Sequence, residues 1–190
     1  MGITNRSIAI DAAIERGKLA EVPAGAGTAT YLEQGNLSVE GGALEGATLT
    51  GAAKGTIANT DETTLLSYSL PAKSFSAEKQ TLEVEGWGTY APNGNGKTVR
   101  VHFGGQKILD SGQIAASGGT WKFHARIIRT GASTQVIYAT FIQGTTIQAS
   151  TQTVGTQAEG SAILLKTTGQ NASALVNEVV QSAMVVTFSR

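Results

Sequence analysis

Hydrophobic and polar residues alternate along most of the chain after residue 57, with the two-residue period of a β-strand. The clearest run begins at Trp121, where apolar residues hold the odd positions as far as Ile127 and polar residues stand between them. A break over 129–133 contains Gly and Ser, and a second alternating run follows over 134–143. Two such runs joined by a short loop predict an antiparallel hairpin.

The same pattern predicts further strands, separated by turn signals rich in Gly, Pro and Asn. The candidate strands are 57–60, 64–70, 80–90, 97–103, 106–110, 119–130, 134–143, 145–153, 160–168 and 178–189. Short, regularly spaced strands without a helical period are typical of all-β folds. We therefore expect an antiparallel, jelly-roll-like β-sandwich.

The last candidate strand, 178–189, is mostly apolar at both odd and even positions. A strand with one face in water should alternate more cleanly. We therefore expect its second face to be covered, either by the N-terminal segment or by another copy of the chain. The residues predicted to form a subunit interface on this strand are Val180, Met184, Val186 and Phe188.

Residues 1–56 differ from the rest, because they hold one aromatic residue, Tyr31, and many small ones. Only residues 7–16 suggest a short helix. We expect an extended N-terminal arm over 1–56, ordered by docking on a partner, followed by the sandwich over 57–190. The alternative is a disordered leader with no role. The predicted anchors of a particle-binding arm are Ile8, Ile10, Ile14, Leu19, Tyr31, Leu37, Leu44 and Leu49.

Charge and composition exclude several function classes. Charged residues make up 15% of the chain and its formal net charge is zero, against about 25% charged residues in an average domain. Without a basic patch, nucleic-acid binding has little support. The absence of cysteine rules out thiolate chemistry. Neither a signal peptide nor an apolar run of membrane length is evident, so we expect no membrane partner and synthesis in a cytoplasm.

Two motifs suggest chemistry only weakly. Residues 94–98 resemble part of a phosphate-binding loop, but Ala91 stands where its first glycine is needed and a strand follows. A hairpin loop is the favoured interpretation. His102 and His124 lie among strand residues, and no further ligands accompany them, so we expect no metal site.

Glu83, Glu85 and Trp87 share one face of a predicted strand. Paired carboxylates suggest a glycan hydrolase, but neighbours on a flat strand are usually solvated. Trp87 either stacks on a sugar or turns into the core, and its usual burial favours the core. We expect no catalytic residue and no cofactor, so the protein is not predicted to be an enzyme.

Five short motifs follow one another in a fixed order along the chain. They are Leu70-Pro71-Ala72, Trp87-Gly88, Gly96-Lys97-Thr98-Val99, Phe103-Gly104-Gly105 and Ile127-Ile128-Arg129-Thr130-Gly131. With these motifs, about the last two-thirds of the chain resembles a β domain of tailed-bacteriophage virion structural proteins, found in tail-fibre or spike modules and in capsid decoration proteins. The resemblance implies a jelly-roll-like sandwich, often trimeric and without catalysis. Residues 1–56 lie outside it.

Two function classes follow from this resemblance. The first is a capsid decoration (cement) protein, a homotrimer on the virion surface that is assembled in the host cytoplasm and stabilises the head. Its partners would be the major capsid protein and neighbouring copies of itself. The second is a receptor- or glycan-binding module of a tail or head fibre, although the sequence gives no separate support for a glycan. The short length, the start at Met1 and the lack of a repetitive shaft favour the first.

Overall fold

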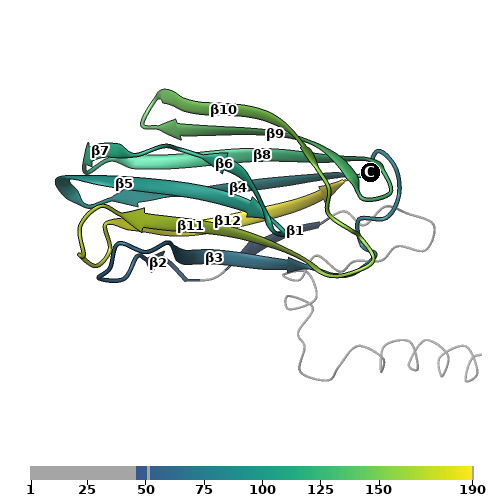
Figure 1. Ribbon diagram of the computed structural model, residues 1–190, viewed down its shortest axis with the longest axis horizontal. Helices are drawn as coiled ribbons and strands as arrows, with labels where there is room; N and C mark the ends of the chain where they lie inside the picture. The colour runs from purple at the N-terminus through teal and green to yellow at the C-terminus, as the bar shows by residue number, and fades with distance from the viewer. Residues whose placement is uncertain (1–45, 51, 190) are drawn as a thin grey trace, which may run out of the picture.

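The computed structural model describes residues 46–50 and 52–189, with side chains described over 52–189. These residues form two antiparallel β-sheets packed face to face (Figure 1). The strands are β1 (Gly46–Thr50), β2 (Lys54–Gly55), β3 (Thr63–Leu70), β4 (Thr81–Tyr90), β5 (Pro92–Phe103), β6 (Gln106–Asp110), β7 (Ile114–Ser117), β8 (Thr120–Gly131), β9 (Thr134–Gln143), β10 (Thr146–Gly155), β11 (Ile163–Asn171) and β12 (Val179–Ser189).

Sheet A has the strand order β1-β12-β4-β8-β9-β10, with β2 also paired to β12. Sheet B has the order β3-β11-β5-β6, with β7 also paired to β5. Strands from opposite ends of the chain are therefore neighbours in both sheets. Apart from the added β9–β10 hairpin, this is the order of a double-sheet jelly roll, and the predicted fold class is confirmed.

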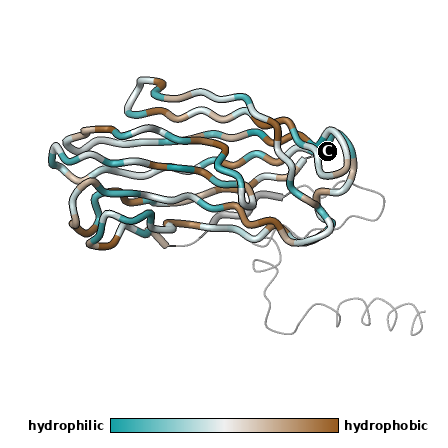
Figure 2. The backbone as a smooth tube through the Cα atoms, viewed as in Figure 1, coloured by the Kyte–Doolittle hydropathy of each residue, from teal (hydrophilic) through white to brown (hydrophobic). Residues whose placement is uncertain are grey.

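The core lies between the sheets and follows the alternation seen in the sequence. The odd positions of β8 from Trp121 to Ile127 are buried, and the polar residues between them face outward. Trp121 stacks against Phe123 and Phe141 with ring centroids 6.5 Å and 6.1 Å apart. Hydrophobic and hydrophilic positions alternate along the paired strands in Figure 2. The predicted β8–β9 hairpin is confirmed.

The prediction for the last strand needs correction. The pairing of β12 with β4 shifts register between Gln181 and Ala183, and such a bulge exchanges the inner and outer sides of a strand. Met184, Val186 and Phe188, predicted as a subunit interface, are 0%, 4% and 8% exposed in the core. They therefore have no surface to offer a second copy. Val180 is half-buried and keeps part of its surface.

The sandwich also begins earlier than the predicted boundary at residue 57. Strands β1 and β2 both pair with β12, where they cover an edge that would otherwise expose unpaired backbone groups. Leu49, a predicted arm anchor, lies in β1 opposite Val185. The candidate strand 57–60 is a loop. The other predicted anchors, Ile8, Ile10, Ile14, Leu19, Tyr31, Leu37 and Leu44, lie outside the described residues.

Candidate binding surfaces

A buried ion pair joins the middle of β5 to the residue before β12. Lys97 Nζ lies 3.2 Å from Glu178 Oε2, and the two side chains are 0% and 1% exposed. The ammonium also donates to backbone oxygens of Asn93, Asn95 and Ala116 at 2.9–3.0 Å and to Asn93 Oδ1 at 2.9 Å. A buried charge is tolerated only with such pairing, so this cluster fixes the local backbone.

Glu178 is held in its charged form by the same cluster. Burial on its own would raise the pKa of Glu178, but hydrogen bonds from Asn93 and Asn95 and the ammonium of Lys97 bring the pKa below its ordinary value. Residues 94–98, which resemble part of a phosphate-binding loop, lie within strand β5, so the predicted hairpin loop is wrong. The lysine of this segment is enclosed by protein oxygens and is not available to a phosphate.

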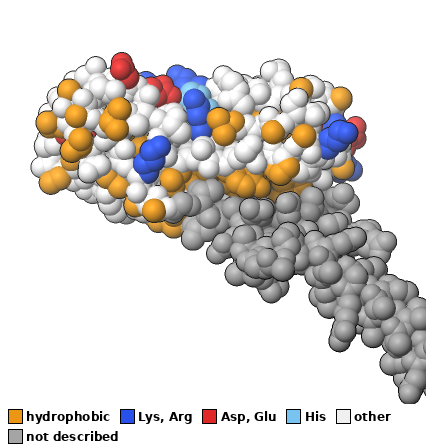
Figure 3. Space-filling view, turned by 90° about the horizontal axis from the view of Figure 1, so that it is seen from below, with side chains coloured by type: hydrophobic (Ala, Val, Ile, Leu, Met, Phe, Trp, Pro, Cys, Tyr) orange, Lys and Arg blue, Asp and Glu red, His pale blue; other side chains and the backbone are white. Residues whose placement is uncertain are grey.

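The loops around the buried pair form an apolar tip. The Asn171 amide donates to the carbonyls of Ile57 (3.1 Å) and Leu175 (2.8 Å), so the two loops lie side by side. Ile57, Leu175 and Val176, which we call the apolar tip, are 55%, 49% and 62% exposed. Hydrophobic side chains are visible at this end of the molecule in Figure 3, on the left. Grouped apolar side chains on a surface mark an interaction site.

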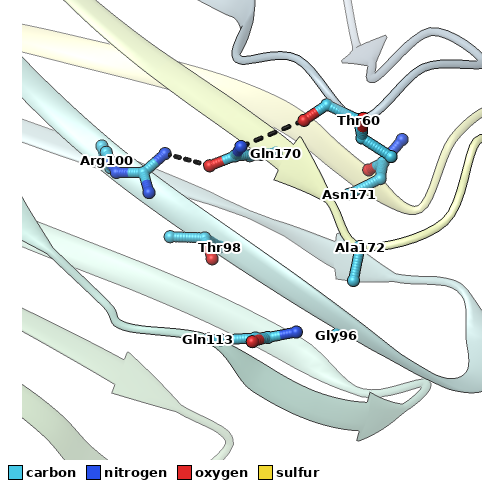
Figure 4. Close-up of a pocket in the computed structure, with 8 residues that line it drawn as sticks. All are labelled: Thr60, Gly96, Thr98, Arg100, Gln113, Gln170, Asn171 and Ala172. Carbon is cyan, nitrogen blue, oxygen red and sulfur yellow. Dashed lines mark hydrogen bonds between the residues drawn. The ribbon is translucent and has the colours of Figure 1, made fainter.

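A polar groove of about 460 Å³ lies next to the apolar tip (Figure 4). Arg100 donates to Gln170 Oε1 at 2.7 Å, and Gln170 donates onward to the Thr60 carbonyl at 3.0 Å. Arg100 also pairs with Glu62 and Asp110 at 3.2 Å and 3.0 Å, so its charge is already balanced. The lining residues are Thr60, Gly96, Thr98, Arg100, Gln113, Gln170, Asn171 and Ala172.

The two histidines lie in different sheets, His102 on β5 of sheet B and His124 on β8 of sheet A. His102 Nε2 lies 2.9 Å from Glu62 Oε1. Burial lowers the pKa of His102 in spite of the opposing charge and hydrogen bond of Glu62. Within residues 52–189, no three His, Asp or Glu side chains are grouped so that they could hold a metal ion. This part of the chain also has no helix able to cross a membrane.

Trp87 lies on the outer face of sheet A, 42% exposed, and the expectation that it packs in the core is wrong. Its two glycine neighbours point inward instead. A Cβ on Gly88 would come within 1.9 Å of the Val180 carbonyl oxygen, and one on Gly86 within 2.3 Å of the Phe123 ring. Because the β8 aromatics fill the space inside both glycines, the Trp87 ring is left on the outside.

The predicted common face of Glu83, Glu85 and Trp87 is confirmed, since all three alternate with buried residues of β4. The Glu83 carboxylate lies 3.6 Å from Arg126 Nε and 3.8 Å from His124 Nε2. Both partners are outward-facing residues of β8, with side chains 52% and 45% exposed. In water such pairs contribute little to stability. This face therefore presents charged side chains and one indole ring to the solvent.

Two shallow depressions, each of about 320 Å³, adjoin Trp87. Trp87 and its cross-strand neighbour Lys122 line both of them and form the ridge between them. Glu85, His124 and Ile142 contribute to the first depression. Thr89, Thr120 and Ser182 contribute hydroxyl groups to the second.

No family model matches this chain, and neither a curated protein nor a solved structure is similar enough to count as a match.

Proposed function

We propose that this protein is a non-enzymatic structural component of a larger assembly, and that it acts as a capsid decoration (cement) protein of a tailed bacteriophage. The apolar tip is the observation that carries the proposal. Ile57, Leu175 and Val176 stand exposed on a protein of which only 15% is charged. Burying a fully exposed side chain of this kind is worth about 1.5–3 kcal/mol, and a partner that covers these half-exposed residues gains part of that for each.

The rigidity of the tip supports attachment as its role. Asn171 and the Lys97–Glu178 pair hold both loops before any partner arrives. A surface that is already ordered loses little conformational entropy on binding, so more of the burial energy appears as affinity. A preformed docking surface is therefore favoured over a loop that orders only on contact.

The proposed location on a virion and the proposed trimeric state both rest on the resemblance of the chain to phage structural modules. A homotrimer would present three apolar tips to a particle, and linked weak contacts bind far more tightly than single ones. The predicted anchors between Ile8 and Leu49 would add to that valency. In this proposal the partners are the major capsid protein and neighbouring copies of the chain.

The test is co-sedimentation of the full-length protein with undecorated phage heads. We expect the wild type to sediment alone as a trimer and to bind heads. Replacing Leu175 and Val176 together by Asp should abolish binding while the protein stays folded. Ile147→Asp is the matched control, because Ile147 is 63% exposed on the edge strand β10 and lies outside the tip.

Two results would contradict the proposal. Equal binding by the tip variant would show that another surface attaches the protein. If electron microscopy of the source particle locates the chain on the tail and the wild type does not bind heads, the fibre module replaces the decoration protein.

A further inference from the structure

The exposed indole of Trp87 stands on β4, an interior strand of sheet A. Strand β4 is paired on both sides, with β12 and with β8. Inward-facing Gly86 and Gly88 let Phe123 and Trp121 pack directly under the strand backbone. The ring is therefore presented by a rigid scaffold, as precise binding sites require.

The polar groups beside the ring are free to bind. Glu85 and Lys122 have no ion-pair or hydrogen-bond partner through their side chains within residues 52–189. The carboxylate accepts hydrogen bonds, and the ammonium donates them. On the far side of the ridge, Ser182 adds a hydroxyl group that can do both.

These groups together favour a neutral, hydroxyl-rich ligand. A carboxylate and an ammonium in the same depression select neither an anion nor a cation. The apolar face of a sugar ring covers an indole, while its hydroxyls reach donors and acceptors around the rim. Each depression of about 320 Å³ is at the lower end of the usual pocket range, which suits one ring in each.

We propose that the ridge of Trp87 and Lys122 is a saccharide-binding site that takes a neutral oligosaccharide of at least two rings, one on each side of the ridge. Trp87 supplies the stacking surface. Glu85 and Lys122 hydrogen-bond the ring in the first depression, and Ser182 that in the second. The site shares no residue with the apolar tip, so this proposal can be tested independently of the proposed attachment to capsids.

The test begins with the full-length protein on an array of neutral and acidic oligosaccharides from bacterial surfaces and plants. The chain has two tryptophans, and Trp121 is only 1% exposed, so acrylamide quenching reports on Trp87. We expect a neutral oligosaccharide to bind and to protect Trp87 from the quencher. Trp87→Ala should weaken binding by at least about tenfold without changing the melting temperature.

The matched control is Tyr138→Ala, because Tyr138 is 44% exposed on the same face but lines neither depression. We expect it to bind like the wild type, and Lys122→Ala to bind several-fold more weakly. The proposal is overturned if nothing on the array binds, if only acidic sugars bind, or if Trp87→Ala binds as well as the wild type. A change in oligomeric state caused by Trp87→Ala would also overturn it, because the ring would then be a contact between copies.

Discussion

The end of the molecule around Lys97 and the outer face of sheet A contain the same kinds of charged side chains in opposite surroundings. Lys97 and Glu178 are 0% and 1% exposed, whereas Glu83 and Arg126 are 40% and 52% exposed. Buried charges must be fully paired, so the first cluster fixes the backbone around it. Charges in water are screened and mobile, so the second face is free to meet a ligand.

The largest effect is expected from Lys97→Met. It removes the cation and leaves Glu178 as a buried, uncompensated charge, which typically costs about 3–5 kcal/mol. Denaturant unfolding measures the loss. The double variant Lys97→Met/Glu178→Leu should regain part of that stability, since neither charge then remains. If Lys97→Met lowers the free energy of unfolding by less than about 1 kcal/mol, the cluster is hydrated. Its charges would then not differ from those on the outer face of sheet A.

Acid should weaken the same cluster. The pKa of Glu178 is lower in the folded protein than its ordinary value of 4.5, because the bonds from Asn93 and Asn95 and the charge of Lys97 outweigh burial. The stabilisation is therefore complete above pH 4.5 and is lost as the pH falls through the lower, folded-state pKa. Unfolding free energies measured from neutral pH down to acid should fall less steeply in Glu178→Gln than in the wild type. Identical slopes would show that Glu178 is not the group responsible.

A smaller effect is expected from Asn171→Ala. The change removes the amide that bridges the carbonyls of Ile57 and Leu175, and unsatisfied buried groups cost about 1–3 kcal/mol. Hydrogen exchange in the loops on either side of the apolar tip should become faster. The exposed Gln152→Ala on β10 is the control and should change neither stability nor exchange. Unchanged exchange in Asn171→Ala would mean that the tip is held mainly by Lys97 and Glu178.

The smallest effect is expected from Arg126→Met on the outer face of sheet A. Its pairing with Glu83 at 3.6 Å lies in water, and exposed pairs contribute at most about 1 kcal/mol. Thermal unfolding should be nearly that of the wild type. A loss as large as that of Lys97→Met would show that this face is covered in solution, and would favour an interface between copies.

Much of the sandwich could be predicted from alternation alone. Most strand ranges could be predicted, as could the side of β8 and β9 that faces the core. Both follow because apolar side chains are buried in the core while the polar ones between them stay in water. Alternation was wrong in β12, where the register shift near Gln181 moved Met184 into the core. A bulge of this kind has no clear signal in the order of apolar and polar residues. Trp87 does follow the alternation of β4, and the expectation of a buried ring failed because it rested on the average burial of tryptophan.

The all-β class, most strand ranges and the common face of Glu83, Glu85 and Trp87 follow from local alternation, because they depend on neighbours two residues apart. Packing of the two sheets was needed to bring Lys97 to Glu178 and to join the loops of Ile57 and Leu175 through Asn171. It was also needed to place β1 and β2 beside β12. These contacts join residues far apart in the chain. Their energies depend on burial, which is a property of the packed sheets and not of any local stretch of sequence.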